Sequence, residues 1–89
     1  MPSKHRKPGA RIQYGDVAAR QADEFTAAET IDVDRALSAI SADPTLGVMR
    51  IKTEHGGLMW EYRQPGTSVR IIYTMTVRRT IITVAYFEA

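Results

Sequence analysis

The chain has 89 residues, of which 44% are apolar and 25% charged, and it contains no cysteine. A chain of this length and composition predicts one globular domain, and it excludes collagenous, wholly disordered and disulfide-stapled proteins as well as thiolate metal sites. No uncharged apolar run approaches the roughly 20 residues that span a bilayer, and no apolar stretch follows the basic N-terminus as in a secretory signal. We therefore expect a cytoplasmic protein that does not cross a membrane.

The net charge of +2 is unevenly distributed along the chain. Residues 1–11 carry a net charge of +4, residues 12–43 carry −5, and residues 44–89 carry +3. Any contact with a polyanion is therefore expected in the C-terminal half or in the N-terminal segment. The alternative is that these charges only solvate the surface of a small domain.

Residues 1–9 are basic and contain Pro2, Pro8 and Gly9, which predicts a flexible basic tail before a single domain at 10–89. A short alternating pattern at 10–14 predicts a strand, and Gly15-Asp16 then breaks the pattern as a helix N-cap would. The following apolar spacing predicts a first helix over about 17–28.

A second helix is expected after an N-cap at Thr30 or Asp32, because apolar residues follow at the i, i+3, i+4 and i+7 positions of an amphipathic helix. Asp43-Pro44 ends it, since the residue before a proline is disfavoured in helical conformation. The short connection predicts that the two helices form an antiparallel hairpin.

From residue 47 onward the apolar period changes to two. Strands are predicted at 48–52, 58–63, 69–76 and 80–87, with turns at Gly56-Gly57 and Pro65-Gly66 and a weaker turn at 77–79. Short connections between successive strands indicate an antiparallel meander. The predicted fold class is therefore α+β: a short N-terminal strand, a two-helix hairpin, and a sheet of three or four antiparallel strands with both helices on one face.

Strand alternation assigns side chains to the two faces of this sheet. The core face is expected to carry Leu58, Trp60, Tyr62, Val69, Ile71, Tyr73 and Met75. The open face is expected to carry Met59, Glu61, Arg63, Arg70 and Ile72. A four-residue reversal at 64–67 would place Glu61 opposite Arg70 and Arg63 opposite Ser68.

Glu61, Arg63 and Arg70 allow two interpretations. An exposed cross-strand ion pair between Glu61 and Arg70 would contribute roughly 0.2 to 1 kcal/mol and carry no function. Alternatively, the two arginines bind a phosphate or a carboxylate, and Glu61 orients one of them.

Several common sites have no counterpart in the sequence. His5 falls in the predicted tail and His55 in a predicted turn, and no histidine spacing is typical of a metal site. No glycine-rich phosphate loop with its lysine occurs either. We therefore expect neither a metal nor a cofactor.

Three segments resemble the RelE/ParE superfamily of toxins from bacterial type II toxin–antitoxin pairs. They are Ala-Ile-Ser-Ala-Asp-Pro at 39–44, Leu-Met-Trp-Glu-Tyr-Arg at 58–63 and Val-Arg-Ile-Ile-Tyr-Thr-Met at 69–75. The resemblance covers about residues 11–88 and implies the fold of that superfamily. Members similar to RelE cut messenger RNA on the ribosome and so inhibit translation, whereas ParE-like members inhibit DNA gyrase, and both kinds are neutralised by an antitoxin.

The resemblance also implies roles for individual residues. Arg70 matches the family arginine that contacts the scissile phosphate, and Arg63 matches a basic position on the neighbouring strand. The chain departs from the pattern at Glu61, where many members have a second basic residue. It departs again at Glu88, which takes the place of a C-terminal histidine.

Cleavage through the ribose 2′-hydroxyl requires a base, an acid and positive charge at the phosphate. Arg70 and Arg63 supply the charge, Glu61 or Glu88 is the candidate base, and Tyr86 is the candidate acid. For Glu88 the alternative is a frayed residue at the end of the chain. The leading hypothesis is a metal-independent, ribosome-dependent mRNA endoribonuclease with a cognate antitoxin; the alternative is a gyrase inhibitor of the ParE kind or an inactive protein-binding member.

Overall fold

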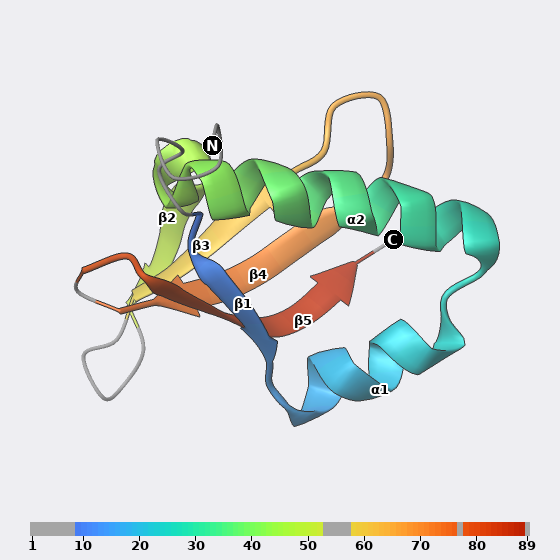
Figure 1. Ribbon diagram of the computed structural model, residues 1–89, viewed down its shortest axis with the longest axis horizontal. Helices are drawn as coiled ribbons and strands as arrows, with labels where there is room; N and C mark the ends of the chain where they lie inside the picture. Colours follow the sequence, from blue (N-terminus) through green and yellow to red (C-terminus); the bar gives the residue numbers. More distant parts are fainter. Residues whose placement is uncertain (1–8, 53–57, 77, 89) are drawn as a thin grey trace, which may run out of the picture.

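The fold combines two helices with a five-stranded sheet (Figure 1). The computed structural model describes residues 9–52, 58–76 and 78–88. Its elements are β1 (Arg11–Tyr14), α1 (Asp16–Glu24), α2 (Ala27–Ala42), the 3-10 helix η2 (Pro44–Leu46), β2 (Val48–Lys52), β3 (Leu58–Arg63), β4 (Arg70–Met75) and β5 (Ile81–Glu88). No helix among these residues has the length and apolar character needed to cross a bilayer.

The predicted α+β class is confirmed, and the sheet gains one strand over the prediction. Its order is β1-β5-β4-β3-β2, with β2 to β5 forming the predicted antiparallel meander. β1 joins the sheet by pairing in parallel with β5, with Arg11 opposite Ile81 and Tyr14 opposite Val84. The paired residues are about 70 positions apart in the chain, so no local turn signal in the sequence predicts this pairing.

The boundary between the helices differs from the prediction. α1 ends at Glu24 rather than near residue 28, because Phe25 is extended and Thr26 caps α2. Thr26 Oγ1 accepts a hydrogen bond from the Glu29 backbone N–H at 3.1 Å, and the Glu29 carboxylate accepts one from the Thr26 N–H at 2.8 Å. This capping box satisfies two N–H groups at the start of α2. The predicted caps, Thr30 and Asp32, therefore lie inside the helix, whereas its predicted end before Asp43-Pro44 is confirmed.

The core lies between the helices and one face of the sheet, and α2 runs along that face while α1 lies beside β5 (Figure 1). Both helices, β4, β5 and the residue just before β4 contribute to it. Its buried residues are Ala18, Val33, Ala36, Ile40, Val69, Ile71, Tyr73, Ile82, Val84 and Phe87. Trp60, Tyr62 and Met75 pack against this core as predicted, but Leu58 is 42% exposed at the start of β3.

The hairpin between β3 and β4 is shifted from the predicted register. The Gln64 N–H donates to the Val69 carbonyl, so the reversal spans 65–68 and Arg63 lies opposite Arg70. Glu61 therefore lies opposite Ile72 rather than Arg70. Because the displacement is two residues, every side chain of the two strands stays on its predicted face.

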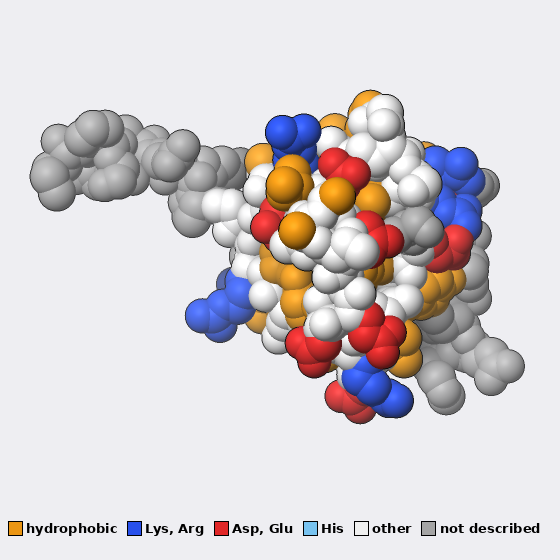
Figure 2. Space-filling view, turned by 90° about the vertical axis from the view of Figure 1, so that its right-hand side faces the viewer, with side chains coloured by type: hydrophobic (Ala, Val, Ile, Leu, Met, Phe, Trp, Pro, Cys, Tyr) orange, Lys and Arg blue, Asp and Glu red, His pale blue; other side chains and the backbone are white. Residues whose placement is uncertain are grey.

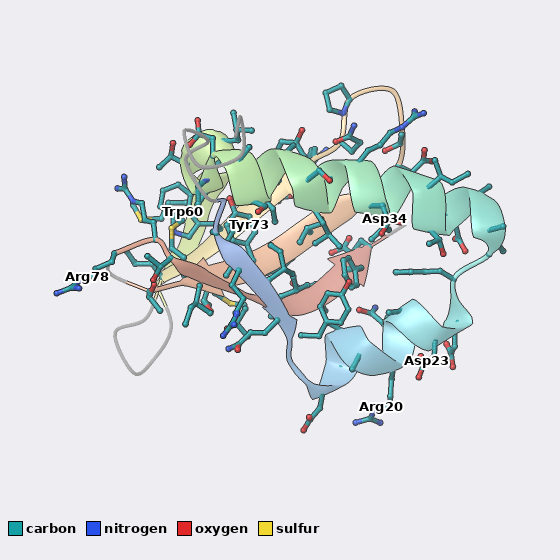
Figure 3. All side chains as sticks on the ribbon, viewed as in Figure 1. Arg20, Asp23, Asp34, Trp60, Tyr73 and Arg78 are labelled. Carbon is teal, nitrogen blue, oxygen red and sulfur yellow. The ribbon has the colours of Figure 1, made fainter. Side chains whose placement is uncertain are left out.

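Tyr73, in the central strand of the sheet, holds η2, the short helix that follows α2 (Figure 3). Its ring is fully buried and stacks on Trp60 with the ring centroids 6.5 Å apart. Its hydroxyl donates to the Pro44 carbonyl at 2.7 Å. A Cβ at Gly47 would lie 2.3 Å from that hydroxyl oxygen, so glycine is needed for this close approach.

Burial raises the pKa of Tyr73 to about 12, although a backbone hydrogen bond from Gly47 partly lowers it. The folded state therefore holds the phenolic proton more tightly than the unfolded chain, whose tyrosines titrate near pH 10. The resulting stabilisation is complete below about pH 10 and is lost as the pH rises towards 12. We expect Tyr73→Phe to flatten this loss in urea unfolding measured between pH 9 and 12.

At pH 7 the same substitution leaves the Pro44 carbonyl without its phenol donor, which should lower the free energy of unfolding by about 1 to 2 kcal/mol. Tyr14→Phe, at a residue that is 42% exposed, is the matched control for this measurement at pH 7. A Tyr73→Phe profile parallel to wild type between pH 9 and 12 would contradict the assignment.

Candidate functional site

The open face of the sheet, which the helices leave uncovered, gathers the five side chains singled out from the sequence. β3 contributes Glu61 and Arg63, β4 contributes Arg70, and β5 contributes Tyr86 and Glu88. Arg63 and Arg70 are paired neighbours, and Arg70 and Glu88 are paired neighbours on its other side. We call these five residues the arginine cluster.

An irregularity in β5 brings Tyr86 and Glu88 to this face. Tyr86 lies opposite Ile72, whereas Val84 lies opposite Tyr73, so Ala85 is an extra residue on β5. Such a bulge reverses the alternation of the side chains that follow it. Ile82 and Val84 point into the core before the bulge and Phe87 points into the core after it, which leaves Tyr86 and Glu88 on the open face.

Glu61 is the buried carboxylate of the arginine cluster. Its exposed fraction is 7%, and Oε2 accepts hydrogen bonds from Arg70 Nη1 at 2.9 Å and from Arg63 Nε at 3.3 Å. The predicted pairing of Glu61 with Arg70 is therefore present, but it is diagonal and shielded from water rather than directly opposite and exposed. Glu61 fixes the positions of both guanidinium groups.

Glu88 binds the other side of Arg70. Its carboxylate accepts a hydrogen bond from Arg70 Nη2, so both terminal nitrogens of this guanidinium donate to carboxylates. Glu88 is the last residue of β5 and lies directly opposite Arg70, which argues against a frayed position. Its side chain is 43% exposed, that of Arg70 33% and that of Arg63 66%.

A small hollow of about 300 Å³ adjoins the arginine cluster. Its lining residues are Met59, Trp60, Glu61, Arg70, Ile72, Tyr86 and Glu88. Ile72 was expected to be exposed on the open face but is 8% exposed, because the flanking strands and their side chains enclose it. The hollow therefore has apolar walls beside a charged group, which suits an amphipathic ligand.

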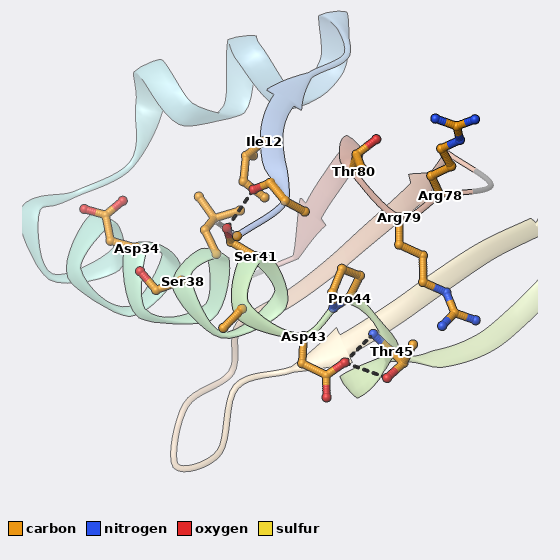
Figure 4. A pocket seen from close by; sticks show the side chains of 14 residues that line it. Ile12, Asp34, Ser38, Ser41, Asp43, Pro44, Thr45, Arg78, Arg79 and Thr80 are labelled. Carbon is orange, nitrogen blue, oxygen red and sulfur yellow. Dashed lines mark hydrogen bonds between the residues drawn. The ribbon is translucent and has the colours of Figure 1, made fainter. Parts of the chain in front are cut away.

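A larger groove lies between the end of α2, the start of β1 and the turn before β5 (Figure 4). Ser41 Oγ donates to the Ala10 carbonyl there, and Asp43 accepts from the backbone and hydroxyl of Thr45. The two hydrogen bonds from Thr45, with the nearby Arg79, lower the pKa of Asp43. The polar groups of the groove therefore hold the chain in place. No pattern in the sequence predicts a groove assembled from three distant segments.

On the face drawn in Figure 2, the charge segregation seen in the sequence does not produce a surface of one sign. Acidic, basic and apolar side chains are interspersed there. Several features singled out from the sequence lie outside the described residues, namely His5, His55 and the Gly56-Gly57 turn. The predicted tail lies outside them as well, except for Gly9, which is exposed. Within the described part of the chain, no group of acidic or histidine side chains is arranged to hold a metal ion.

Comparison with known families finds no match, and comparison with curated protein sequences finds no relative. Among solved structures, the chain is similar to a chain in the crystal structure of the toxin–antitoxin complex RelBE2 from Mycobacterium tuberculosis. The TM-score is 0.70 at 17% sequence identity, and the match covers 92% of this chain and 98% of that chain. The RelE-like fold implied by the sequence resemblance is thereby confirmed.

The buried position of Glu61 leads to a stability prediction. Glu61→Gln removes the charge that both arginines share, so we expect the free energy of unfolding to fall by about 1 to 3 kcal/mol. Glu24→Gln, at an exposed position in α1, should change it by less than about 0.5 kcal/mol. Urea unfolding at pH 7 measures both, and equal effects would contradict the structural role given to Glu61.

Proposed function

We propose that the protein is the toxin of a type II toxin–antitoxin pair and acts as a ribosome-dependent mRNA endoribonuclease that inhibits translation. The observation that carries the proposal is the convergence of Arg63, Arg70, a partly exposed carboxylate and a tyrosine on one open sheet face. The structural likeness to a chain of a toxin–antitoxin complex supports the toxin role.

The arginine cluster holds the groups that RNA cleavage requires. The ribose 2′-hydroxyl loses its proton to a base and attacks the adjacent phosphorus, which yields a 2′,3′-cyclic phosphate. The bond to the 5′-oxygen breaks, and an acid supplies the proton for this leaving group. Arg70 and Arg63 would stabilise the negative charge that develops on the phosphoryl oxygens. No metal is needed in this scheme.

Of the two candidate bases, the geometry favours Glu88. Glu61 is 7% exposed and receives hydrogen bonds from both arginines, so its carboxylate is shielded from an incoming hydroxyl. Glu88 is 43% exposed and borders the hollow that Tyr86 also lines. We therefore assign the base to Glu88, the acid to Tyr86 and the orientation of the arginines to Glu61.

One observation favours the alternative of a toxin that binds a protein such as DNA gyrase without cutting RNA. The formal charges of Arg63, Arg70, Glu61 and Glu88 cancel, whereas RNA-binding surfaces carry a net positive charge. A protein-binding surface should then depend on exposed apolar groups. Val48 of β2, which is 60% exposed and lies opposite Glu61 on the open face, suits a test of such a surface better than the buried Ile72.

Either toxin requires a cognate antitoxin, and we propose that it covers the open face with an acidic or amphipathic segment. Arg63, 66% exposed, offers such a segment a cationic contact beside the hollow. Removal of the Arg63 charge would therefore mainly weaken the electrostatic attraction between the toxin and its antitoxin.

The decisive experiment is controlled expression in a bacterial host with 5′-end mapping of messenger RNA. Wild type should arrest growth and create new transcript ends, and Arg70→Ala should reduce those ends by at least about 100-fold, because the phosphate loses its principal cation. Arg20→Ala, which removes an exposed arginine from α1, is the matched control and should cleave as wild type does.

The possible results separate the two functions. Cleavage that persists in Arg70→Ala would overturn the assignment of the site. Growth arrest with intact transcripts would favour a protein target, and Val48→Ser should then relieve the arrest more than Arg70→Ala does.

A further inference from the structure

The Arg70 site already contains an anion, which is the Glu88 carboxylate. We propose that Glu88 competes with phosphate for Arg70, so that an RNA phosphate enters the site only by displacing it. This inference rests on the proposed function, because it takes Arg70 as the phosphate-binding residue. It adds a property of the site, namely that binding is an exchange of one anion for another.

The hydrogen bonds of Arg70 show why an exchange is required. Nη1 donates to Glu61 and Nη2 donates to Glu88, so a carboxylate occupies each terminal nitrogen. A guanidinium binds phosphate most strongly through two parallel N–H groups. Every two-point mode of a guanidinium uses at least one of its terminal nitrogens, so a phosphate bound in this way would share that nitrogen with a carboxylate and compete with it.

The two carboxylates differ in how readily they can leave. Glu61 is 7% exposed and also accepts from Arg63, so its departure would strand a buried charge. Glu88 is 43% exposed and contacts Arg70 from the last position of β5, so its carboxylate can move into water. The exchange therefore takes place on the Glu88 side.

The backbone builds this arrangement into the fold. Glu88 lies directly opposite Arg70 only because the extra residue Ala85 shifts the register of β5 by one. The same shift buries Phe87, which is 2% exposed and packs edge-to-face on Tyr14 and Phe25. The core thus fixes the strand that carries the competing carboxylate.

Displacement of the Glu88 carboxylate from Arg70 would also leave that carboxylate where a catalytic base is required. A carboxylate that leaves Nη2 remains attached to β5, within reach of the phosphate that replaced it. Glu88 is also the residue proposed as the base, and in the free protein its charge is engaged by Arg70. Entry of RNA would therefore release the base at the moment when its substrate is bound.

The test compares Glu88→Gln with wild type, using two probes. A 2′-O-methylated RNA hexanucleotide, which cannot be cleaved, is followed by fluorescence anisotropy, and inorganic phosphate is followed through the backbone amide NMR signals of β3 and β5, which every variant retains. Glu88→Gln should bind both probes about 5- to 20-fold more tightly, because a negative charge beside the anion has been removed. Glu24→Gln, which makes the same charge change on α1, should alter affinity less than about twofold.

A double-mutant cycle with Arg70→Ala makes the test specific. If Glu88 acts through Arg70, then Glu88→Gln should give no gain in the Arg70→Ala background. Circular dichroism checks that each variant folds. In addition, Glu88→Gln should lose RNA cleavage while it gains RNA affinity, a combination that a purely structural role would not produce.

The outcomes distinguish this inference from the proposed function. If Glu88→Gln binds neither probe more tightly while Arg70→Ala weakens binding, the exchange is wrong and the phosphate site stands. If the phosphate results agree but expression of the wild type creates no new transcript ends, the exchange stands and the RNA-cleaving function fails. If Arg70→Ala leaves the binding of both probes unchanged, both proposals fall.

Discussion

The arrangement of both faces of the sheet depends on one extra residue in β5. Without the bulge at Ala85, strict alternation would bury Tyr86 and Glu88 together with Val84 and would expose Phe87. The core requires Val84 and Phe87 on the same side, so the strand must change its alternation between them. The open face thereby receives a phenol and a carboxylate beside Arg70, and a requirement of the core determines the composition of the site.

The sequence predicted the part of the site that rests on regular alternation. Glu61, Arg63 and Arg70 share a face because β3 and β4 alternate without interruption and their hairpin was displaced by an even number of residues. The sequence carries one weak signal of the bulge, which is the odd spacing of the apolar residues Val84 and Phe87. This spacing is recognised as such only once the structure is known. The parallel pairing of β1 with β5 left none, because it depends on tertiary contacts. The residues of the Thr26 capping box are present in the sequence, but apolar periodicity predicted a later start for the second helix.

The burial of Glu61 changes the meaning of its charge. On an exposed sheet, its pairing with arginine would contribute little, and the screened charges would act independently. Beneath Arg63 and Arg70, the carboxylate instead holds two guanidinium groups side by side, which would otherwise repel each other. The alternation of side chains along β3 explains why Glu61 lies on the open face. Its burial, however, follows from the neighbouring strands on both sides of β3. Sequence patterns do not report that burial.

The charge balance of the arginine cluster has consequences for either target. Four groups that neutralise one another provide little long-range attraction, so affinity must come from contacts made after encounter. A large particle such as a ribosome can supply those contacts at a distance from the arginines, and a protein partner can supply them at the exposed Val48 of β2. In both cases the pairing of Arg70 with Glu88 makes the free site a weak binder of stray anions. Selectivity would then arise because only a ligand anchored elsewhere can displace the internal carboxylate.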